Sequence, residues 1–339
     1  MRIWFNKTFS TISAVFNHLR QSKPAGEINI ISTHTHSYAS AFLSADESYL
    51  EPAELSGQLY IDWCLDFCHQ YHIDLFWPGK EAALISKNQH LFQSKGIDVL
   101  SVADFSTLTL LHNKADFYTS LSHDVAIPMD FVAVNTLQAF DNAVSELSKK
   151  HEKLCVKPAT SVYGLGFRIL DKQRDSITHL LKGVEYQIPL EELRKGMINT
   201  PDFETLLVME YLSGHEWSVD CAGKQGELLC AVQRKKPLQA GHGQTIDDNP
   251  IIESMVKRLT THYRLNGIYN IQFKEGILGP RLLEINPRPS GGFGMSCLSG
   301  ANLAQIALQG FKDEKFQPPR ICKGLKVTEI NTAVVLKQA

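Results

Sequence analysis

The sequence predicts two kinds of folded region in succession: an open parallel α/β sheet at the amino-terminal end, then an α+β region. In the first hundred residues, short β-rich apolar runs alternate with helical patterns, which is the order of β-α-β units. After about residue 105, strand-like stretches follow one another and helices stand between them, which is typical of an α+β fold. The 339 residues allow two or three domains.

The amino-terminal region is expected to contain four strands and three helices. The strands are predicted at 2–5, 29–32, 74–77 and 98–100, and the helices at 11–21, 60–71 and 81–95. In open parallel sheets, ligands bind outside the carboxyl ends of the strands. The polar turns at those ends are 6–8, 33–36 and 78–80. His34 and His36 could both point one way, but no further metal ligand accompanies them.

The second region is expected to be richer in strands. Helices are predicted at 110–121, 137–150, 249–263 and 303–311. Two strand-like runs lie within 154–170, and further strands are predicted at 205–211, 217–221, 227–233, 268–274 and 281–285. No internal repeat or low-complexity segment interrupts this order.

Composition argues against several classes of protein. A content of 43% hydrophobic and 21% charged residues is that of a soluble globular protein. The net charge of -2 and the lack of like-charge runs argue against nucleic-acid and membrane-surface partners. No apolar run is long enough for a membrane span or a signal-peptide core, and seven cysteines fit a reducing compartment, so a cytoplasmic location is predicted. Cys64 and Cys68 could clasp a metal, but without a second pair buried small hydrophobes are the better interpretation.

Two motifs in the middle of the chain could contact a nucleotide. An apolar strand carries Lys157, and a turn with Gly164 and Gly166 follows, so backbone N–H groups could approach phosphate oxygens. An ordinary hairpin is the alternative. Further on, Glu210 ends a strand and Glu216 opens the next, so both carboxylates could face one ligand. Solvated turn charges explain this second motif equally well.

A third motif near the carboxyl-terminal end is more specific. Glu284 and Asn286 lie two residues apart on a predicted strand and therefore share a face. Gln272 stands on the preceding strand, and Pro287 and Arg288 follow. Such an oxygen-only set suits Mg²⁺ that shares its shell with substrate phosphates. A polar strand terminus is the alternative.

In order and spacing these motifs resemble the ATP-grasp superfamily of carboxylate-amine ligases, most closely its carbamoyl-phosphate-synthase and biotin-carboxylase-like branch. The resemblance covers roughly residues 105–310. It implies a Rossmann-like pre-ATP-grasp domain at 1–104, an ATP-grasp domain at 105–311 with a central subdomain at about 115–210, and a carboxyl-terminal segment at 312–339. The opening IWFNKTFS, taken with the grasp core, also suggests the ATP-grasp enzymes of bacterial tellurium-resistance and stress operons.

The resemblance assigns expected roles to individual residues. ATP and Mg²⁺ (or Mn²⁺) are the implied cofactors, and Arg288 and Lys157 the implied catalytic residues. The implied metal ligands are Gln272, Glu284 and Asn286. The implied nucleotide contacts are Lys114, Lys157, Gly164, Gly166, Glu210, Tyr211, Leu212 and Glu216, with the loop 163–166 closing over the phosphates.

The implied reaction is phosphorylation of a small-molecule carboxylate to an acyl phosphate, which an amine then attacks. Retention of Arg288 argues against the first rival, an ATP-binding regulatory module without ligase activity. The second rival is a phosphotransferase that releases a phosphorylated product. Neither a P-loop nor a dinucleotide fingerprint occurs. A homodimer is the default assembly.

Two further segments could contact the substrate. The basic run Arg234-Lys235-Lys236 follows a predicted strand and could reach a phosphate or carboxylate, although a solvated turn is equally compatible. Ser290 and Gly291 follow the metal-binding strand, and exposed N–H groups there could cradle a carboxylate. Nothing in these segments identifies the substrate.

Overall fold

The chain forms two compact units, each built from separate parts of the sequence. The computed structural model describes residues 1–9, 11–21, 27–161, 164–173, 176–181, 186–238, 243–315, 317–330 and 332–335. The first unit comprises Met1–Thr109, His215–Phe273 and Glu284–Ala339, and the second comprises Leu110–Gly214 and Lys274–Leu283. The predicted domain limits at 104, 311 and about 115–210 remain predictions.

The amino-terminal part of the first unit is a parallel five-stranded sheet in the order β3-β2-β1-β4-β5. The strands are β1 (Arg2–Asn6), β2 (Asn29–His34), β3 (Glu47–Leu50), β4 (Leu75–Trp77) and β5 (Asp98–Val99). The helices are α1 (Ile12–Arg20), α2 (Gly57–Gln70), α3 (Ala82–Lys87) and α4 (Gln89–Gln93), with a 3₁₀ turn at Ser40–Leu43. The parallel α/β prediction is therefore confirmed, and β3 is an edge strand that its short, half-polar sequence did not reveal.

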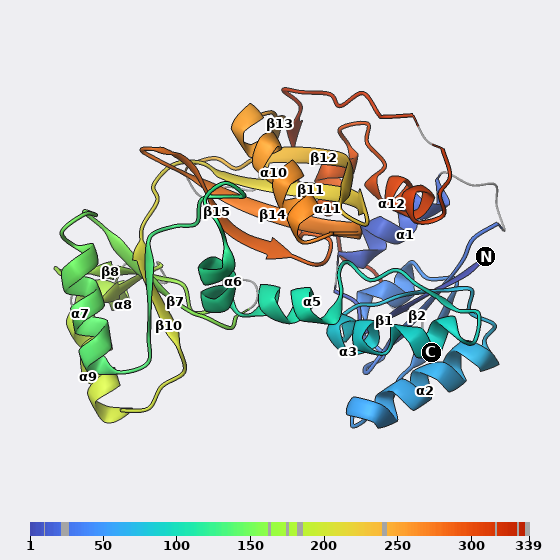
Figure 1. The fold of residues 1–339 in the computed structure, drawn as a ribbon, viewed down its shortest axis with the longest axis horizontal. Coiled ribbons are helices and arrows are strands. Elements are labelled where there is room, and N and C mark those ends of the chain that lie inside the picture. Colours follow the sequence, from blue (N-terminus) through green and yellow to red (C-terminus); the bar gives the residue numbers. More distant parts are fainter. Residues whose placement is uncertain are drawn as a thin grey trace. The chain divides into compact units, whose positions relative to one another are not determined.

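The helices α1 and α2 lie on opposite faces of this sheet (Figure 1). Ile3 and Phe5 belong to a core shared with α1, whereas Trp4 belongs to a core shared with α2, because successive side chains of a strand point to opposite faces. Trp4 stacks on Phe76 with ring centroids 4.0 Å apart. The predicted helix at 81–95 is wrong in one respect. It is broken at Asn88, whose side-chain amide donates to the Leu84 carbonyl and whose backbone leaves the helical region.

The second unit contains a five-stranded sheet in the order β6-β10-β7-β8-β9. Its pairings are antiparallel except for β8 with β9. The strands are β6 (Phe131–Val134), β7 (Leu154–Pro158), β8 (Arg168–Asp171), β9 (Gln187–Pro189) and β10 (Leu206–Glu210). The helices are α6 (Lys114–Ser120), α7 (Leu137–Leu147), α8 (Ser176–Leu181) and α9 (Leu190–Asn199). Figure 1 shows α7 and α9 side by side over this sheet, where Phe140, Met197 and Val208 share one core.

The predicted helix at 110–121 is in fact two helices. The chain forms α5 (Phe105–His112), leaves the helical conformation at Asn113, and restarts as α6. The Asn113 side chain accepts hydrogen bonds from the backbone N–H groups of Ala115 and Asp116, which is an N-cap. Lys114 is therefore the first residue of a helix rather than a residue in the middle of one.

A six-stranded sheet in the order β15-β14-β11-β12-β13-β16 contains the remaining strands, and all of it except Lys274–Leu283 of the β14–β15 hairpin belongs to the first unit. The strands are β11 (Glu216–Lys224), β12 (Glu227–Lys235), β13 (Gln244–Asp247), β14 (Gly267–Gly276), β15 (Gly279–Asn286) and β16 (Lys326–Val327). The helices are α10 (Pro250–His262), α11 (Phe293–Cys297) and α12 (Leu303–Phe311). Leu303 and Ala307 of α12 lie in the same core as Val15 and Phe16 of α1, so distant parts of the chain stabilise one unit.

The cysteines agree with the expectation that Cys64 and Cys68 are buried small hydrophobes. All seven cysteines are free, and burial raises the pKa of the Cys64 and Cys68 thiols, so both behave as small hydrophobes. Over the described ranges, no helix combines the length and the apolar character that a membrane crossing requires.

Candidate functional site

Lys114 and Lys157 lie against the same part of the second unit. Lys114 is 6% exposed, and its ammonium donates to the Ser161 carbonyl at 2.7 Å. Lys157 projects from β7, and its ammonium donates to the hydroxyl of Tyr118 at 3.1 Å. Tyr118 is four residues after Lys114 and therefore on the same face of α6. Both lysines therefore lie between α6 and β7, together with the segment that follows β7.

Tyr118 is a component of this arrangement that sequence reasoning missed. Its hydroxyl donates to the Leu283 carbonyl within the same unit, while its ring lies 5.3 Å from the Lys157 ammonium. The i, i+4 spacing from Lys114 is the only signal in the sequence that could have found it. A buried tyrosine with a hydrogen-bonded hydroxyl fixes the direction in which Lys157 points.

The glycines of the predicted phosphate-covering loop occupy conformations that favour glycine. Gly164 and Gly166 have φ values of 68° and 80°. A Cβ on Gly166 would stand 2.6 Å from Cδ of Pro158, whereas one on Gly164 would meet open space. Residues 162 and 163 lie outside the described residues, so the predicted contact of this loop with phosphate remains a prediction.

The predicted adenine-contacting segment is tied to its own unit. The Glu210 carboxylate accepts from the Asp130 backbone N–H at 3.1 Å and lies 3.6 Å from Nδ1 of His151. The Tyr211 N–H donates to the Lys153 carbonyl at 3.0 Å, and Leu212 is buried. The structure thus fixes the conformation of this segment, and its contact with adenine remains a prediction.

Glu216 begins β11 in the first unit, where its carboxylate pairs with the Lys236 ammonium. The two residues also bond through their backbones, because the Lys236 N–H donates to the Glu216 carbonyl at 2.8 Å. Both side chains are about one-third exposed. An ionised carboxylate has about four acceptor sites, so the pair leaves room for a ribose hydroxyl.

The predicted metal ligands lie on two adjacent strands of the first unit. Glu284 and Asn286 share a face of β15, since Ile285 between them is buried, and the Asn286 amide donates to the Glu284 carboxylate at 2.9 Å. Gln272 is half-buried on β14, with no hydrogen bond to either of them in the described part of the chain. A set with a single carboxylate fits Mg²⁺ that takes further oxygen ligands from phosphates. Across the described ranges, no three His, Cys, Asp or Glu side chains group together as metal ligands.

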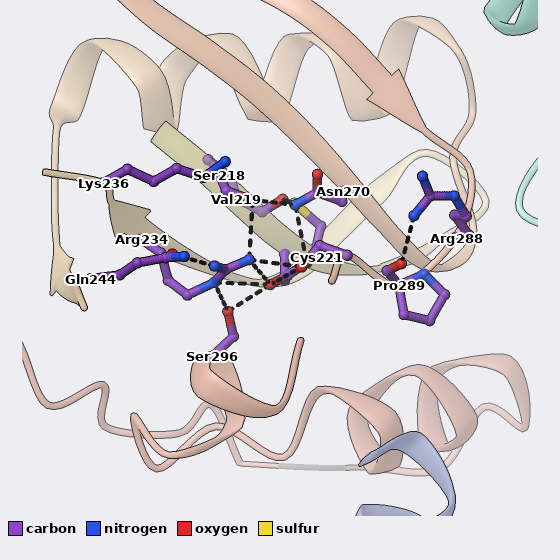
Figure 2. A network of polar contacts seen from close by, with 12 residues as sticks. Ser218, Val219, Cys221, Arg234, Lys236, Gln244, Asn270, Arg288, Pro289 and Ser296 are labelled. Carbon is purple, nitrogen blue, oxygen red and sulfur yellow. Dashed lines mark hydrogen bonds and ion pairs between the residues drawn. The ribbon is translucent and has the colours of Figure 1, made fainter. Parts of the chain in front are cut away.

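Arg288 stands next to these residues at the end of β15. Its guanidinium donates to the Asn286 side-chain oxygen at 3.4 Å and to the Pro289 carbonyl at 3.2 Å, as Figure 2 shows for the latter. It also lies over the ring of Phe9, 4.8 Å from the centroid. These contacts hold the cation beside Glu284 and Asn286, the two predicted oxygen ligands.

The expectation for Arg234 in the basic run 234–236 is wrong, because this residue is neither in a solvated turn nor directed outward. β12 extends through Lys235, and Arg234 is 1% exposed at the centre of a polar network (Figure 2). Its guanidinium donates to Asp220 at 2.9 Å, to Ser290 at 2.7 Å and to Ser296 at 2.8 Å, and also to Gln244. The structure therefore supports a positioning role for Arg234 rather than contact with substrate.

Asp220 is the anionic centre of this network and was not predicted. It is fully buried, and it accepts from Arg234, Ser290, Ser296 and, at 3.0 Å, from the Asn270 amide. A buried ion pair is tolerated when its remaining polar atoms are also hydrogen-bonded, as they are here. Nothing in the local sequence VDCAG marks this aspartate as buried.

The segment after β15 is anchored on the same network. Ser290 is buried between Asp220 and Arg234, and a Cβ on Gly292 would stand 2.3 Å from the Arg234 guanidinium. Gly291 is exposed, with open space where a Cβ would lie. The backbone at Gly291 therefore remains accessible to a ligand. Lys235 points to the other face of β12, with its ammonium 5.2 Å from the centre of the Trp217 ring.

Comparison with known proteins agrees with the resemblance seen in the sequence. Residues 202–333 match the family model described as "ATP-grasp in the biosynthetic pathway with Ter operon". No curated protein matches the sequence. Among solved structures, N5-carboxyaminoimidazole synthetase from Staphylococcus aureus complexed with ADP is 12% identical, with a TM-score of 0.68 over 96% of this chain and 81% of that one. The chain has an ATP-grasp fold.

Two further solved structures are similar at the same level. The biotin carboxylase domain of Hydrogenobacter thermophilus 2-oxoglutarate carboxylase, with MgADP, ADP and bicarbonate, is 13% identical, with a TM-score of 0.65 over 94% of this chain and 72% of that one. L-Amino acid ligase from Bacillus licheniformis is 12% identical, with a TM-score of 0.63 over 91% of this chain and 73% of that one. At such identities the likeness establishes the fold and leaves the substrate open.

Proposed function

We propose that this ATP-grasp protein is an ATP-dependent ligase that joins a small-molecule carboxylate to an amine. The observation that carries the proposal is the end of β15, where Glu284 and Asn286 share a face and Arg288 stands beside them. This strand lies inside the 202–333 segment that matches the ATP-grasp family model. A hard oxygen pair next to a fixed guanidinium suits a transferring phosphoryl group and its metal.

The proposed reaction has two steps, and each conserves its atoms and charges. A carboxylate oxygen of the substrate attacks the γ-phosphorus of ATP, and ADP leaves, which produces an acyl phosphate. The amine nitrogen then attacks the acyl carbon, phosphate leaves, and the nitrogen releases a proton. Such chemistry requires positioning and charge neutralisation more than covalent help from the protein.

The proposed residues divide these tasks among them. Lys114 and Lys157 neutralise phosphate oxygens, and Tyr118 keeps Lys157 oriented. A bound Mg²⁺ would supply further charge neutralisation, and its protein ligands are Glu284, Asn286 and Gln272. Arg288 offsets the negative charge that develops on the transferring group.

The remaining proposed contacts concern the nucleotide base, the ribose, the phosphates and the substrate carboxylate. The proposed partners are the 210–212 segment for adenine, Glu216 for ribose, the 164–166 loop for phosphate, and the Gly291 backbone for the carboxylate. Two of the similar structures hold ADP, which supports a nucleotide ligand.

The assembly and the location of the protein are also proposed only in general terms. A reducing compartment such as the cytoplasm fits seven free cysteines, six of them buried. A homodimer remains the default proposal for a soluble metabolic enzyme. One of the similar structures is described as a domain dimer, which is compatible with this proposal.

A substrate screen separates the ligase from its two rivals. Purified protein with Mg-ATP would be incubated with pools of carboxylates, with and without pools of amines, while ADP release is followed and products are identified by mass spectrometry. Stimulated ADP release with an amide product supports the ligase. A stable phosphorylated product identifies a phosphotransferase, and nucleotide binding without stimulation by any pool identifies a regulatory module.

Two lysine variants in the same unit provide the matched control for this screen. Lys157→Gln removes a cation held by Tyr118, and we expect it to abolish the stimulated ADP release. Lys195→Gln removes an exposed cation from α9 and should leave the release unchanged. Equal activity of both variants would contradict the role given to Lys157.

A further inference from the structure

Five side chains at the carboxyl edge of the amino-terminal sheet form a cluster that the ligase chemistry does not use. We call it the carboxyl-edge cluster, and its members are Lys7, Thr8, His34, His36 and Lys80. His34 is the last residue of β2, and the others stand on the turns after β1, β2 and β4, which are neighbours in the sheet. This is the edge at which open parallel sheets bind ligands.

Backbone contacts fix the three turns to one another. The Lys7 N–H donates to the Thr33 carbonyl at 3.0 Å, and the Lys80 N–H donates to the Lys7 carbonyl at 3.4 Å. The Asn6 side chain accepts from the Gly79 N–H at 2.7 Å. The relative positions of the cluster residues are therefore defined before any ligand arrives.

A buried polar network beneath the cluster holds Lys7 in place. Glu51 is 4% exposed and accepts from the Thr33 hydroxyl at 2.6 Å and from the Tyr60 hydroxyl at 3.2 Å. The Lys7 ammonium lies 3.5 Å from Glu51 and over the Tyr60 ring. Lys7 also has a φ of 37°, a left-handed conformation that is costly for any residue but glycine and that clusters at functional sites.

The cluster contains polar atoms that the described part of the chain does not satisfy. Oγ1 of Thr8 and Nδ1 of His34 are buried and have no hydrogen-bond partner among the described residues. Buried polar atoms are nearly always paired in native proteins, so an unpaired set beside a ligand-binding edge indicates a missing partner. That partner must offer hydrogen-bonding atoms at the level of the turns.

The charged groups around these atoms indicate that the partner carries a negative charge. Burial, followed by the charges of His36, Lys80 and Lys7, lowers the pKa of His34 to about 4. Lys7 already has Glu51 and Glu81 nearby, each at 3.5 Å. Lys80 is exposed and forms no ion pair with a described residue. A negative group would offset the positive charges that lower the pKa of His34 and would pair with Lys80.

Thr8 of the cluster and Arg288 line the same small cavity. It is lined by Thr8, Phe9, Gly79 and Arg288, and its volume is about 30 Å³, the room of a single water molecule or of the end of a ligand. The carboxyl-edge cluster therefore lies next to the arginine to which the proposed reaction assigns the transferring group, within one unit.

We propose that Thr8, His34, His36 and Lys80 bind an oxyanion, the phosphate or carboxylate group of a small molecule. The assignment of this molecule to the ligase as a substrate rests on the proposed function. The binding of the anion rests only on the geometry of the carboxyl-edge cluster.

A titration of the full chain without nucleotide tests this proposal. Ring-nitrogen NMR signals of the histidines would be followed at about pH 6, where histidines titrate, while inorganic phosphate or acetate replaces chloride at constant ionic strength. The signals of His34 and His36 are assigned with His34→Gln and His36→Gln. We expect both to shift saturably, and the pKa of His34 to rise. The anion that binds more tightly identifies the group as phosphate or carboxylate.

Two lysine variants show whether the binding is specific. Lys80→Gln should weaken the binding at least about fivefold, the effect of losing one charge contact at an exposed site. Lys95→Gln removes an exposed cation from the turn before β5, at the opposite edge of the sheet, and should have no effect. Saturable shifts would support the site even if the ADP-release screen failed. Absence of shifts with both anions, or equal weakening by both variants, would overturn it.

Discussion

Arg288 occupies a position that favours a role in turnover over a role in nucleotide affinity. Its guanidinium is stacked on Phe9 and bonded to Asn286, so the cation is fixed beside the proposed metal ligands. Arg288→Ala should lower turnover by two to three orders of magnitude, about 3 kcal/mol, because one preorganised electrostatic contact is lost. Substrate-stimulated ADP release measures this effect, and nucleotide titration should show nearly unchanged affinity. Unchanged turnover would refute the role.

Asp220 is predicted to be critical for stability. Asp220→Asn leaves the buried Arg234 guanidinium without its counter-charge, and removal of one partner of a buried pair costs about 3–5 kcal/mol. Denaturant unfolding measures the change. Asp248→Asn provides the control, since its pair with Lys323 is at least half exposed and should contribute little to stability. Similar losses in the two variants would contradict the assignment.

His34 should make the stability of the protein depend on pH. An unfolded histidine takes up its proton near pH 6.5, whereas His34 in the folded protein does so only near about 4. The folded state therefore loses stability as the pH falls from about 6.5 to about 4. Burial raises the pKa of Glu51, which acts in the opposite direction, so the quantity to measure is the difference between wild type and His34→Gln. An identical pH slope in both proteins would show that the depressed pKa of His34 is absent.

At the level of elements, the helix α6 depends on its cap. Asn113 satisfies two N–H groups at the start of the helix that carries Lys114 and Tyr118. Asn113→Ala should cost about 1 kcal/mol, the usual cost of losing an N-cap. Asn113→Ser retains a capping oxygen and should lose much less. Urea unfolding compares the two variants, and equal stability of Asn113→Ala and wild type would show that the cap contributes nothing.

The elements also show how far sequence reasoning extends. The Glu-x-Asn spacing in β15 was sufficient to predict that Glu284 and Asn286 share a face, because this pattern is local. The break at Asn113 was missed because its capping signal lies inside a continuous helical pattern. Local patterns therefore predicted shared faces, but they predicted neither the limits of the helices nor short strands such as β3, β6 and β13.

The burial of Arg234 could not be predicted from its neighbours. A basic run at the end of a strand usually lies in water. The groups that accept hydrogen bonds from Arg234 are 14, 56 and 62 residues away, at Asp220, Ser290 and Ser296. Only the pairing of strands and the return of the chain through α11 bring them together. The contact of Lys7 with Glu51 could not be predicted for the same reason, because Glu51 lies 44 residues later in the sequence.

At the scale of the whole molecule, each compact unit is built from segments that are far apart in the sequence. Lys114 and Lys157 belong to the second unit, whereas Glu284, Asn286 and Arg288 belong to the first, together with the amino-terminal sheet. The sequence predicted the α/β and α+β regions, but not that α1 and α12 would share one core. The ATP-grasp fold accounts for both units and leaves the identity of the acceptor to experiment.

Transfer of an isotope from substrate to phosphate tests the central proposal, activation of a carboxylate by ATP, most directly. A carboxylate found in the ADP-release screen would be labelled with ¹⁸O, and the phosphate released with Mg-ATP and an amine would be analysed by mass spectrometry. If an acyl phosphate forms, each phosphate released should carry one ¹⁸O from the carboxylate. Unlabelled phosphate, released while ADP and the amide accumulate, would contradict the proposal.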